Sequence, residues 1–158
     1  MNDACVAGGL ELLLACDMAL AAESARIGDG HLNFGQLPGA DGSQRLPRTI
    51  GPMGAKFLML SGEFLDAAVA QLMSLIGRIF PDCHLEAGSM VLCQAMAKHS
   101  AVGWRGAKYL INRGLAGDLQ IGLRMELEFA HNYATTEQDA MEGLLALKEK
   151  RRPEYEQD

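Results

Sequence analysis

The pattern of hydrophobic and polar residues divides the chain into two regions. Up to about residue 81, short apolar runs alternate with segments of helical spacing, and this alternation is typical of strand-and-helix units. Beyond that point apolar residues recur at three- and four-residue intervals, which predicts helices alone. We therefore expect a strand-and-helix core over residues 1–81 and a helical region over residues 82–158.

Within residues 1–81 the pattern predicts short strands and helices in alternation. Strands are expected at Ala4–Ala7, Met18–Ala22, Ala25–Gly28 and Leu75–Phe80, and helices at Leu10–Cys16, from Asp41 to a break at Gly51-Pro52, at Met53–Leu60 and at Ala67–Leu72. Asp41 and Gln44 have the spacing of a capping box, and Asp66 is an acceptor that can cap the last of these helices. The Pro and Gly content of residues 35–42 predicts a loop.

The second region is predicted to form amphipathic helices. They are expected at Leu85–Lys98, Trp104–Asn112, Leu119–Tyr133 and Thr136–Lys150. The third of them carries a single apolar stripe, made of Leu119, Leu123, Leu127 and Ala130. Such a stripe offers a surface for association with another helix.

Composition and charge narrow the class of protein. Of the 158 residues 49% are hydrophobic and 22% charged, as in a globular protein with one sizeable core. The net charge of -6 argues against nucleic acid as a partner, and no apolar run has the length of a membrane span. No metal-ligand spacing occurs among the histidines and cysteines, so no metal site is predicted. The cysteines form no C-x-x-C pair and are expected to be buried free thiols in a reducing cytoplasm; they are Cys5, Cys16, Cys83 and Cys93.

The residues that point most clearly to chemistry follow the first predicted strand. Gly8 and Gly9 allow a sharp turn and a close approach of a ligand to the backbone. The helix after them directs unpaired N–H groups and the positive end of its dipole towards such a ligand. Glu11, an acid among leucines, adds a carboxyl group for proton transfer. The run Gly28-Asp29-Gly30, by contrast, lacks the further residues of a phosphate loop.

Several runs in this sequence resemble the crotonase superfamily, the enoyl-CoA hydratases and isomerases. They are GGLELLLACDMALAAE from Gly8 to Glu23, GQLPGADGSQRLPR from Gly35 to Arg48, and the ending, with DAMEG from Asp139 and EKRRP from Glu149. The runs follow the family's order along nearly the whole chain. Asn2 matches an Asn in a core strand of the family, so the resemblance covers the C-terminal portion of the family domain and implies that its N-terminal part is missing.

The resemblance implies an α/β fold, a partial crotonase-like spiral of ββα repeats followed by a C-terminal helical oligomerisation region. It also implies an acyl-CoA thioester as substrate, and no cofactor other than the coenzyme A that is part of that substrate. A homo-oligomer, a trimer or a multiple of one, is expected. Neither nucleic acid nor a membrane is expected as a partner, and the expected location is cytoplasmic.

For the site, the resemblance implies that the Gly8 N–H, beside Gly9, is one of two amides that bind the thioester oxygen as an enolate forms. The second amide belongs to the missing part. Glu11 matches the first of the two carboxylates that hydratases use. Structural explanations stay open, because the glycines can simply make a tight turn and Glu11 can be a first-turn acid favoured by the helix dipole.

Three further positions have a role in the family and a structural alternative. His31 stands where the family often has its second carboxylate; histidine can act as acid or base, and the alternative is a loop histidine in an inactive chain. Asp41 replaces a glycine of the family's Gly-Ala-Gly-Gly signature and is either catalytic or the helix cap described above. Lys150 matches a basic position that contacts the phosphates of coenzyme A, or is one of the basic residues common at helix C-termini.

Two interpretations therefore follow from the sequence. In the first, the chain is a crotonase-type enzyme, a hydratase or isomerase, that stabilises an enolate through Gly8 and moves protons through Glu11 and His31. In the second, it is a catalytically incomplete crotonase-like protein that only self-associates or pairs with another chain.

Overall fold

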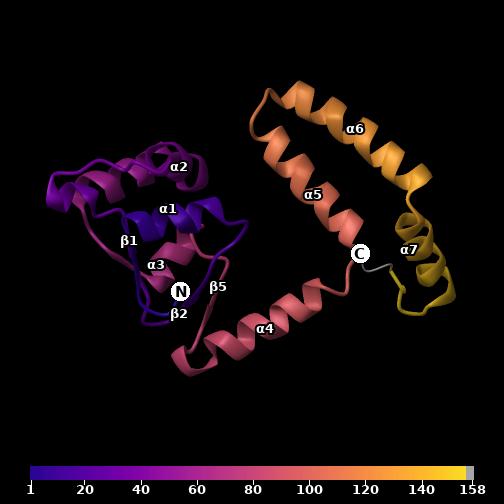
Figure 1. Ribbon diagram of the computed structural model, residues 1–158, viewed down its shortest axis with the longest axis horizontal. Helices are drawn as coiled ribbons and strands as arrows, with labels where there is room; N and C mark the ends of the chain where they lie inside the picture. The colour runs from indigo at the N-terminus through magenta and orange to yellow at the C-terminus, as the bar shows by residue number, and fades with distance from the viewer. Residues whose placement is uncertain (156–158) are drawn as a thin grey trace. The chain divides into compact units, whose positions relative to one another are not determined.

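The computed structural model describes residues 1–155, which divide into two compact units (Figure 1). The first is Met1–Val91 and the second begins at Leu92. Helix α4, Leu85–Met96, therefore contributes residues to both.

The first unit alternates short strands with helices, as the sequence predicts. Its strands are β1 (Ala4–Val6), β2 (Leu20–Ala22), β3 (Arg26–Gly28), β4 (Leu65–Asp66) and β5 (Arg78–Phe80), its helices are α1 (Gly8–Ala15), α2 (Gly42–Ser61) and α3 (Ala67–Leu72), and its 3-10 turns are η1 (His31–Phe34) and η2 (Asp82–His84). The strand expected at Leu75–Phe80 is shorter than predicted. Its first residues close α3 instead, because the Leu75 N–H donates to the carbonyl of Ala70 at 2.9 Å.

The strands form two small sheets, with the orders β1-β3-β4 and β2-β5. β1 runs parallel to β3, with Val6 opposite Gly28, whereas β3 and β4 are antiparallel. β2 and β5 are also parallel, with Leu20 opposite Arg78. Because paired parallel strands end at the same edge of a sheet, the segments that follow β1 and β3 leave it side by side. This places the start of α1 next to residues 29–31.

Helix α2 consists of two helical segments joined at a kink. Gly51 has φ 78 and ψ 158, outside the helical range, and Pro52 follows it. The predicted break is therefore confirmed. The predicted capping box is wrong, because Asp41 has φ 73 and its side chain makes no capping hydrogen bond. A side-chain cap acts from an extended backbone, which Asp66 does have: its Oδ1 accepts the Val69 N–H at 2.8 Å, as predicted.

Large aliphatic side chains from α1, β3 and α2 form the core of the first unit. Leu10, Ile27, Leu46 and Leu58 are fully buried and belong to one cluster. Helices α1 and α2 pack against each other (Figure 1). Burial of each such side chain contributes about 1.5–3 kcal/mol. The core therefore holds α1 firmly against α2. Glu11 follows the buried Leu10 and is held in place with it.

The second unit is helical, and every helix predicted for it is present. After the end of α4 come α5 (Ala101–Gly114), α6 (Leu119–Thr136) and α7 (Gln138–Glu149). α5 packs against α6, with the rings of Tyr109 and Phe129 stacked at a centroid distance of 5.5 Å. α5 begins earlier than predicted because Ser100 caps it: its Oγ accepts the Gly103 N–H at 2.9 Å.

The leucines of the predicted stripe, Leu119, Leu123 and Leu127, lie on α6 and are at least half exposed. The role of this region in oligomerisation stays a prediction. No helix in the described part of the chain combines the length and the hydrophobicity needed to cross a bilayer.

The cysteines differ from the prediction. All are free thiols, but only Cys5 is buried, whereas Cys16, Cys83 and Cys93 are exposed. An apolar run is a local property of the sequence, whereas burial depends on which face of an element meets a neighbour. Burial raises the pKa of the Cys5 thiol above its ordinary value.

Candidate active site

Glu11 is buried in the first turn of α1, and one of its oxygens is fully engaged. Its Oε1 accepts the N–H groups of Ala40 at 2.8 Å and Gly42 at 3.1 Å. Because Gly42 begins α2, Glu11 supplies the capping acceptor that Asp41 does not. A Cβ at position 42 would lie 3.0 Å from Oε1, so glycine permits this close approach. The structural role of Glu11 is thus to hold a second helix, rather than only to complement the dipole of its own.

His31 lies between two carboxylates. Its Nε2 is 3.8 Å from Oε2 of Glu11, and its Nδ1 is 3.1 Å from Oδ1 of Asp29. Asp29 is 1% exposed and the His31 side chain 13%. The backbone N–H of His31 also donates to Oδ2 of Asp29 at 3.3 Å. Gly30, with φ 67, allows the tight turn that brings the ring back beside Asp29.

The parallel pairing of β1 with β3 explains why these residues meet. Directly after β1, the Ala7 N–H donates to the carbonyls of Gly28 at 3.2 Å and Asp29 at 2.8 Å. Ala7 itself has φ 49 and ψ -120, a conformation that a residue with a Cβ rarely adopts. Such backbone strain persists only where the surroundings enforce it and is frequent at functional sites.

Gly8 and Gly9 are the first two residues of α1 and are exposed. The first amides of a helix have no acceptor within it. Among residues 1–155 no hydrogen bond from the Gly8 N–H is found, and a Cβ on Gly8 would meet no atom within 4 Å. Helix α1 therefore begins with an exposed backbone amide.

Two predicted site residues are not brought into this cluster. The carboxylate of Asp41 is 67% exposed and pairs with Arg45 at 3.4 Å, although the amides on either side of it bind Glu11. Lys150 is exposed and ends α7, with φ 55, in the second unit. Its contact with coenzyme A stays a prediction. In the described residues no group of three or more His, Cys, Asp or Glu side chains could hold a metal ion.

The sequence pattern alone does not single out Asp29. It lies in the run Gly28-Asp29-Gly30, which lacks the further residues of a phosphate loop. An Asp side chain commonly bonds to the backbone two residues further on, and here that residue is His31. The Asp-x-His spacing after a predicted strand was therefore the available signal.

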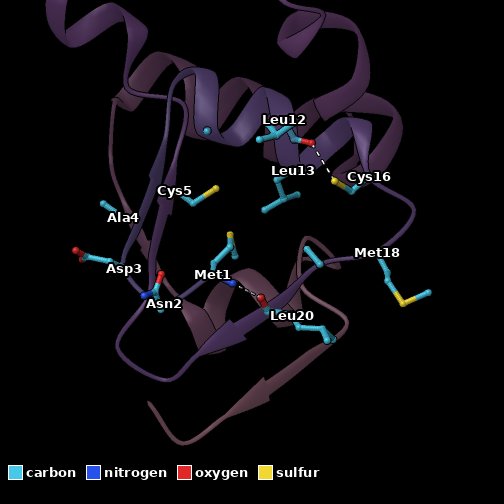
Figure 2. Close-up of a pocket in the computed structure, with 12 residues that line it drawn as sticks. Met1, Asn2, Asp3, Ala4, Cys5, Leu12, Leu13, Cys16, Met18 and Leu20 are labelled. Carbon is cyan, nitrogen blue, oxygen red and sulfur yellow. Dashed lines mark hydrogen bonds between the residues drawn. The ribbon is translucent and has the colours of Figure 1, made fainter. Parts of the chain in front are cut away.

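A separate cavity of about 390 Å³ lies beside α1 (Figure 2). Its lining includes one stripe of α1 together with the chain start and β2, namely Gly9, Leu12, Leu13, Cys16, Met1 and Leu20. Helix residues three or four positions apart share a face, so Gly9, Leu12, Leu13 and Cys16 lie on one face of α1. Glu11 does not share this spacing and lies on the other face. Neither Glu11 nor His31 lines this cavity, so it is not the acid–base site.

The Glu11–His31 pair has the chemistry of an acid–base site. Each side chain is held by one atom, Oε1 of Glu11 and Nδ1 of His31, which leaves Oε2 and Nε2 directed towards each other. At 3.8 Å these two atoms are too far apart for a direct hydrogen bond. A group that brings a hydrogen atom can interact with both, as general acid–base catalysis requires.

Comparisons with known proteins identify the family of this chain. The sequence profile described as "Enoyl-CoA hydratase/isomerase" matches residues 1–158. The match thus covers the whole chain, as the resemblance along the sequence predicts. That the N-terminal part of the family domain is missing stays a prediction. The mitochondrial methylglutaconyl-CoA hydratase of Mus musculus is 39% identical over 152 residues, and 2,3-dehydroadipyl-CoA hydratase of Escherichia coli is 37% identical over 156 residues.

The chain spans only part of these proteins. The match to the mouse hydratase covers 94% of this chain and 48% of the mouse protein. The match to the Escherichia coli hydratase covers 98% of this chain and 60% of the bacterial protein. The crystal structure of an enoyl-CoA hydratase from Bacillus anthracis superimposes with a TM-score of 0.91 at 39% identity, covering 96% of this chain and 58% of that one. The α/β crotonase-like fold is therefore established. The chain belongs to the enoyl-CoA hydratase/isomerase family of the crotonase superfamily.

Proposed function

We propose that this chain binds an acyl-CoA thioester and transfers a proton at its C2 carbon, with Glu11 and His31 as the acid–base pair. The observation that carries the proposal is the 3.8 Å approach of Oε2 to Nε2, with both side chains anchored through their other atoms. The relatives named as hydratases of CoA thioesters support the class of substrate.

In the proposed reaction Oε2 of Glu11 removes a proton from C2. The electrons of that C–H bond form a double bond to the thioester carbon, and the carbonyl electrons move to the oxygen as an enolate. Nε2 of His31, once protonated, returns a proton to C2, and the proton taken up by Glu11 passes to water. The Gly8 N–H, beside Gly9, donates to the enolate oxygen, and one such donor contributes about 3–4 kcal/mol to transition-state stabilisation. Coenzyme A enters as part of the substrate, and no other cofactor takes part.

Hydration of crotonyl-CoA is expected to be weak. In the family, hydratases position water between two carboxylates, whereas here the second of these positions is His31. Because Nδ1 of His31 is bound to Asp29, the ring presents only Nε2 to a ligand, whereas a carboxylate can present two oxygens. A turnover rate typical of an efficient hydratase would contradict this expectation.

Hydrogen–deuterium exchange at C2 of butyryl-CoA tests the proposal directly. In deuterated buffer the chain should replace the C2 protons, as followed by proton NMR. Glu11→Gln should slow the exchange on the order of 10²–10⁴-fold, the usual contribution of a general base. Glu23→Gln removes an exposed carboxylate of the same unit and is the matched control. Equal exchange with and without the wild-type protein would exclude the proposal.

The proposed contact of Lys150 with coenzyme A is tested by a different parameter. Lys150→Ala should raise the concentration of butyryl-CoA needed for half-maximal exchange and leave the maximal rate unchanged, because the phosphates lie far from the reacting carbon. An unchanged half-saturation concentration would remove Lys150 from the binding site.

A second proposed property is self-association through the helical region. This property does not depend on catalytic activity. Among residues 92–155, Ala146 is the only buried apolar side chain, while the leucines of the α6 stripe are exposed. Exposed apolar surface of this kind marks interaction sites. We infer a homo-oligomer, a trimer or a multiple of one as in the family resembled. A stable monomer in sedimentation at micromolar concentration would contradict this.

A further inference from the structure

We propose that Asp29 is a positioning residue that holds His31 as the Nδ1–H tautomer and thereby directs the Nε2 lone pair of the ring towards Glu11. The consequence for catalysis rests on the function proposed above, whereas the tautomer itself does not.

The burial of Asp29 determines which ring nitrogen carries the proton. Oδ1 of Asp29 is 3.1 Å from Nδ1 of His31, and the carboxylate is 1% exposed. A buried carboxylate needs hydrogen-bond donors, and it can only accept. Nδ1 must therefore be protonated. The opposite tautomer would place the Nδ1 lone pair against a carboxylate oxygen.

The second oxygen of Asp29 fixes the carboxylate itself. Oδ2 accepts the backbone N–H of His31 at 3.3 Å, so both oxygens bind the same residue, one through its backbone and one through its ring. Gly30, in the left-handed conformation, makes the turn between them. Rotation of the ring would break the bond to Nδ1 and leave Oδ1 buried without that donor.

The tautomer decides what the site presents to a ligand. With the proton on Nδ1, the neutral ring offers an acceptor at Nε2, 3.8 Å from Oε2 of Glu11. After the ring takes up a proton at Nε2, the new N–H lies beside Glu11 while Asp29 stabilises the positive charge. Glu11 and Asp29 are the carboxylates that form ion pairs with this ring in the described part of the chain. Asp29 acts only through His31.

Nitrogen-15 NMR of the imidazole rings tests the proposal without any substrate. In mildly alkaline buffer the neutral His31 ring should give the shift pattern of the Nδ1–H tautomer. The signal is assigned by its loss in His31→Gln. The exposed rings of His84, His99 and His131 serve as references in the same spectrum.

The variant Asp29→Asn should invert the tautomer. An amide has one acceptor oxygen, and the backbone N–H of His31 can only donate, so the amide oxygen should take that bond. The NH₂ group then faces Nδ1 and forces the proton to Nε2. In the exchange assay this variant should lower the maximal rate at least about tenfold, as for a wrong tautomer in a catalytic histidine, and leave the half-saturation concentration unchanged.

The results separate this proposal from the proposed function. An Nε2–H tautomer in the wild-type protein, or an unchanged tautomer in folded Asp29→Asn, would overturn the role of Asp29. If the variant does not fold, the tautomer of His31 in the wild-type spectrum still tests the proposal. An Nδ1–H tautomer in a chain that exchanges no C2 protons would support the positioning role and exclude the proposed activity alone.

Discussion

At the scale of single residues, Glu11 divides two roles between its two oxygens. Oε1 accepts two backbone N–H groups at the start of α2, and Oε2 lies towards His31. A glutamine keeps one acceptor oxygen for the amides and removes the carboxylate. An alanine removes both. The two substitutions therefore separate the structural role from the chemical one.

We predict that Glu11→Gln melts within a few degrees of the wild type while its C2 exchange falls as described above. Glu11→Ala should lose about 1–3 kcal/mol of stability as well, because the Ala40 and Gly42 amides lose their acceptor. Thermal melting and the exchange assay on both variants separate the structural role of Glu11 from its catalytic role. Full exchange activity in Glu11→Gln would remove Glu11 from the catalytic residues.

Asp41 illustrates strain without a visible chemical role. It has φ 73, and among residues 1–155 its carboxylate pairs with the exposed Arg45. We predict that Asp41→Gly is more stable than Asp41→Ala by about 1 kcal/mol, because glycine adopts the left-handed conformation freely and alanine does not. Both variants should keep the wild-type exchange rate. A large loss of exchange in both, with the fold intact, would restore Asp41 as a catalytic candidate.

At the scale of elements, α3 depends on its cap. It has six residues, and Oδ1 of Asp66 accepts the Val69 N–H at 2.8 Å. We predict that Asp66→Ala loses about 1 kcal/mol, the usual cost of a missing cap, and that Asp66→Asn loses less because it keeps an acceptor. Chemical denaturation measures both. Equal losses in the two variants would show that the hydrogen bond is not the cause.

Helix α7 is tied to the segment after it by Glu142. The guanidinium of Arg151 donates to both carboxylate oxygens, at 2.5 and 2.8 Å, and the Glu154 N–H donates to Oε1 at 2.8 Å. These bonds, with that from Arg151 as the larger cause, lower the pKa of Glu142 from 4.5 to about 2. A lowered pKa in the folded state means that the carboxylate stabilises the fold above its unfolded pKa.

The contribution of Glu142 should therefore be complete above about pH 4.5 and disappear as the pH falls towards 2. We predict that Glu142→Gln lowers the melting temperature at pH 7 and that the difference from the wild type shrinks across this window. Melting curves at several pH values test it. A difference that does not change with pH would exclude the carboxylate as its source.

At the scale of the whole molecule, the two units differ in how much apolar surface they cover. The first has the buried core around Leu10 and Leu58, whereas the described part of the second buries a single apolar side chain, Ala146. A helical unit with so small a core gains from a partner. The proposed self-association would cover the exposed apolar side chains of this helical unit.

We predict that replacing Leu123 and Leu127 together by Glu shifts the chain towards the monomer in sedimentation, because charges disrupt an apolar interface. Ile121→Glu is the matched control, since Ile121 is also exposed on α6 but lies off the stripe. Equal effects of the two changes would mean that the stripe is not the interface.

The sequence by itself determined the order and type of most elements and the family. Helix periods, the break at Gly51-Pro52 and the cap at Asp66 are local features, set by neighbours a few positions away, so the pattern shows them. The resemblance singles out Gly8, Glu11 and His31. It does not give the distances between them in the folded chain.

Only the tertiary structure decided how these residues act together. The parallel register of β1 and β3, with Val6 opposite Gly28, joins segments far apart in the chain and so sets Glu11 beside His31. The burial of Asp29 and the bond of Glu11 to the start of α2 depend on that same packing. Pairing and burial are non-local, because they arise from contacts between elements, and a local pattern of residues does not contain them.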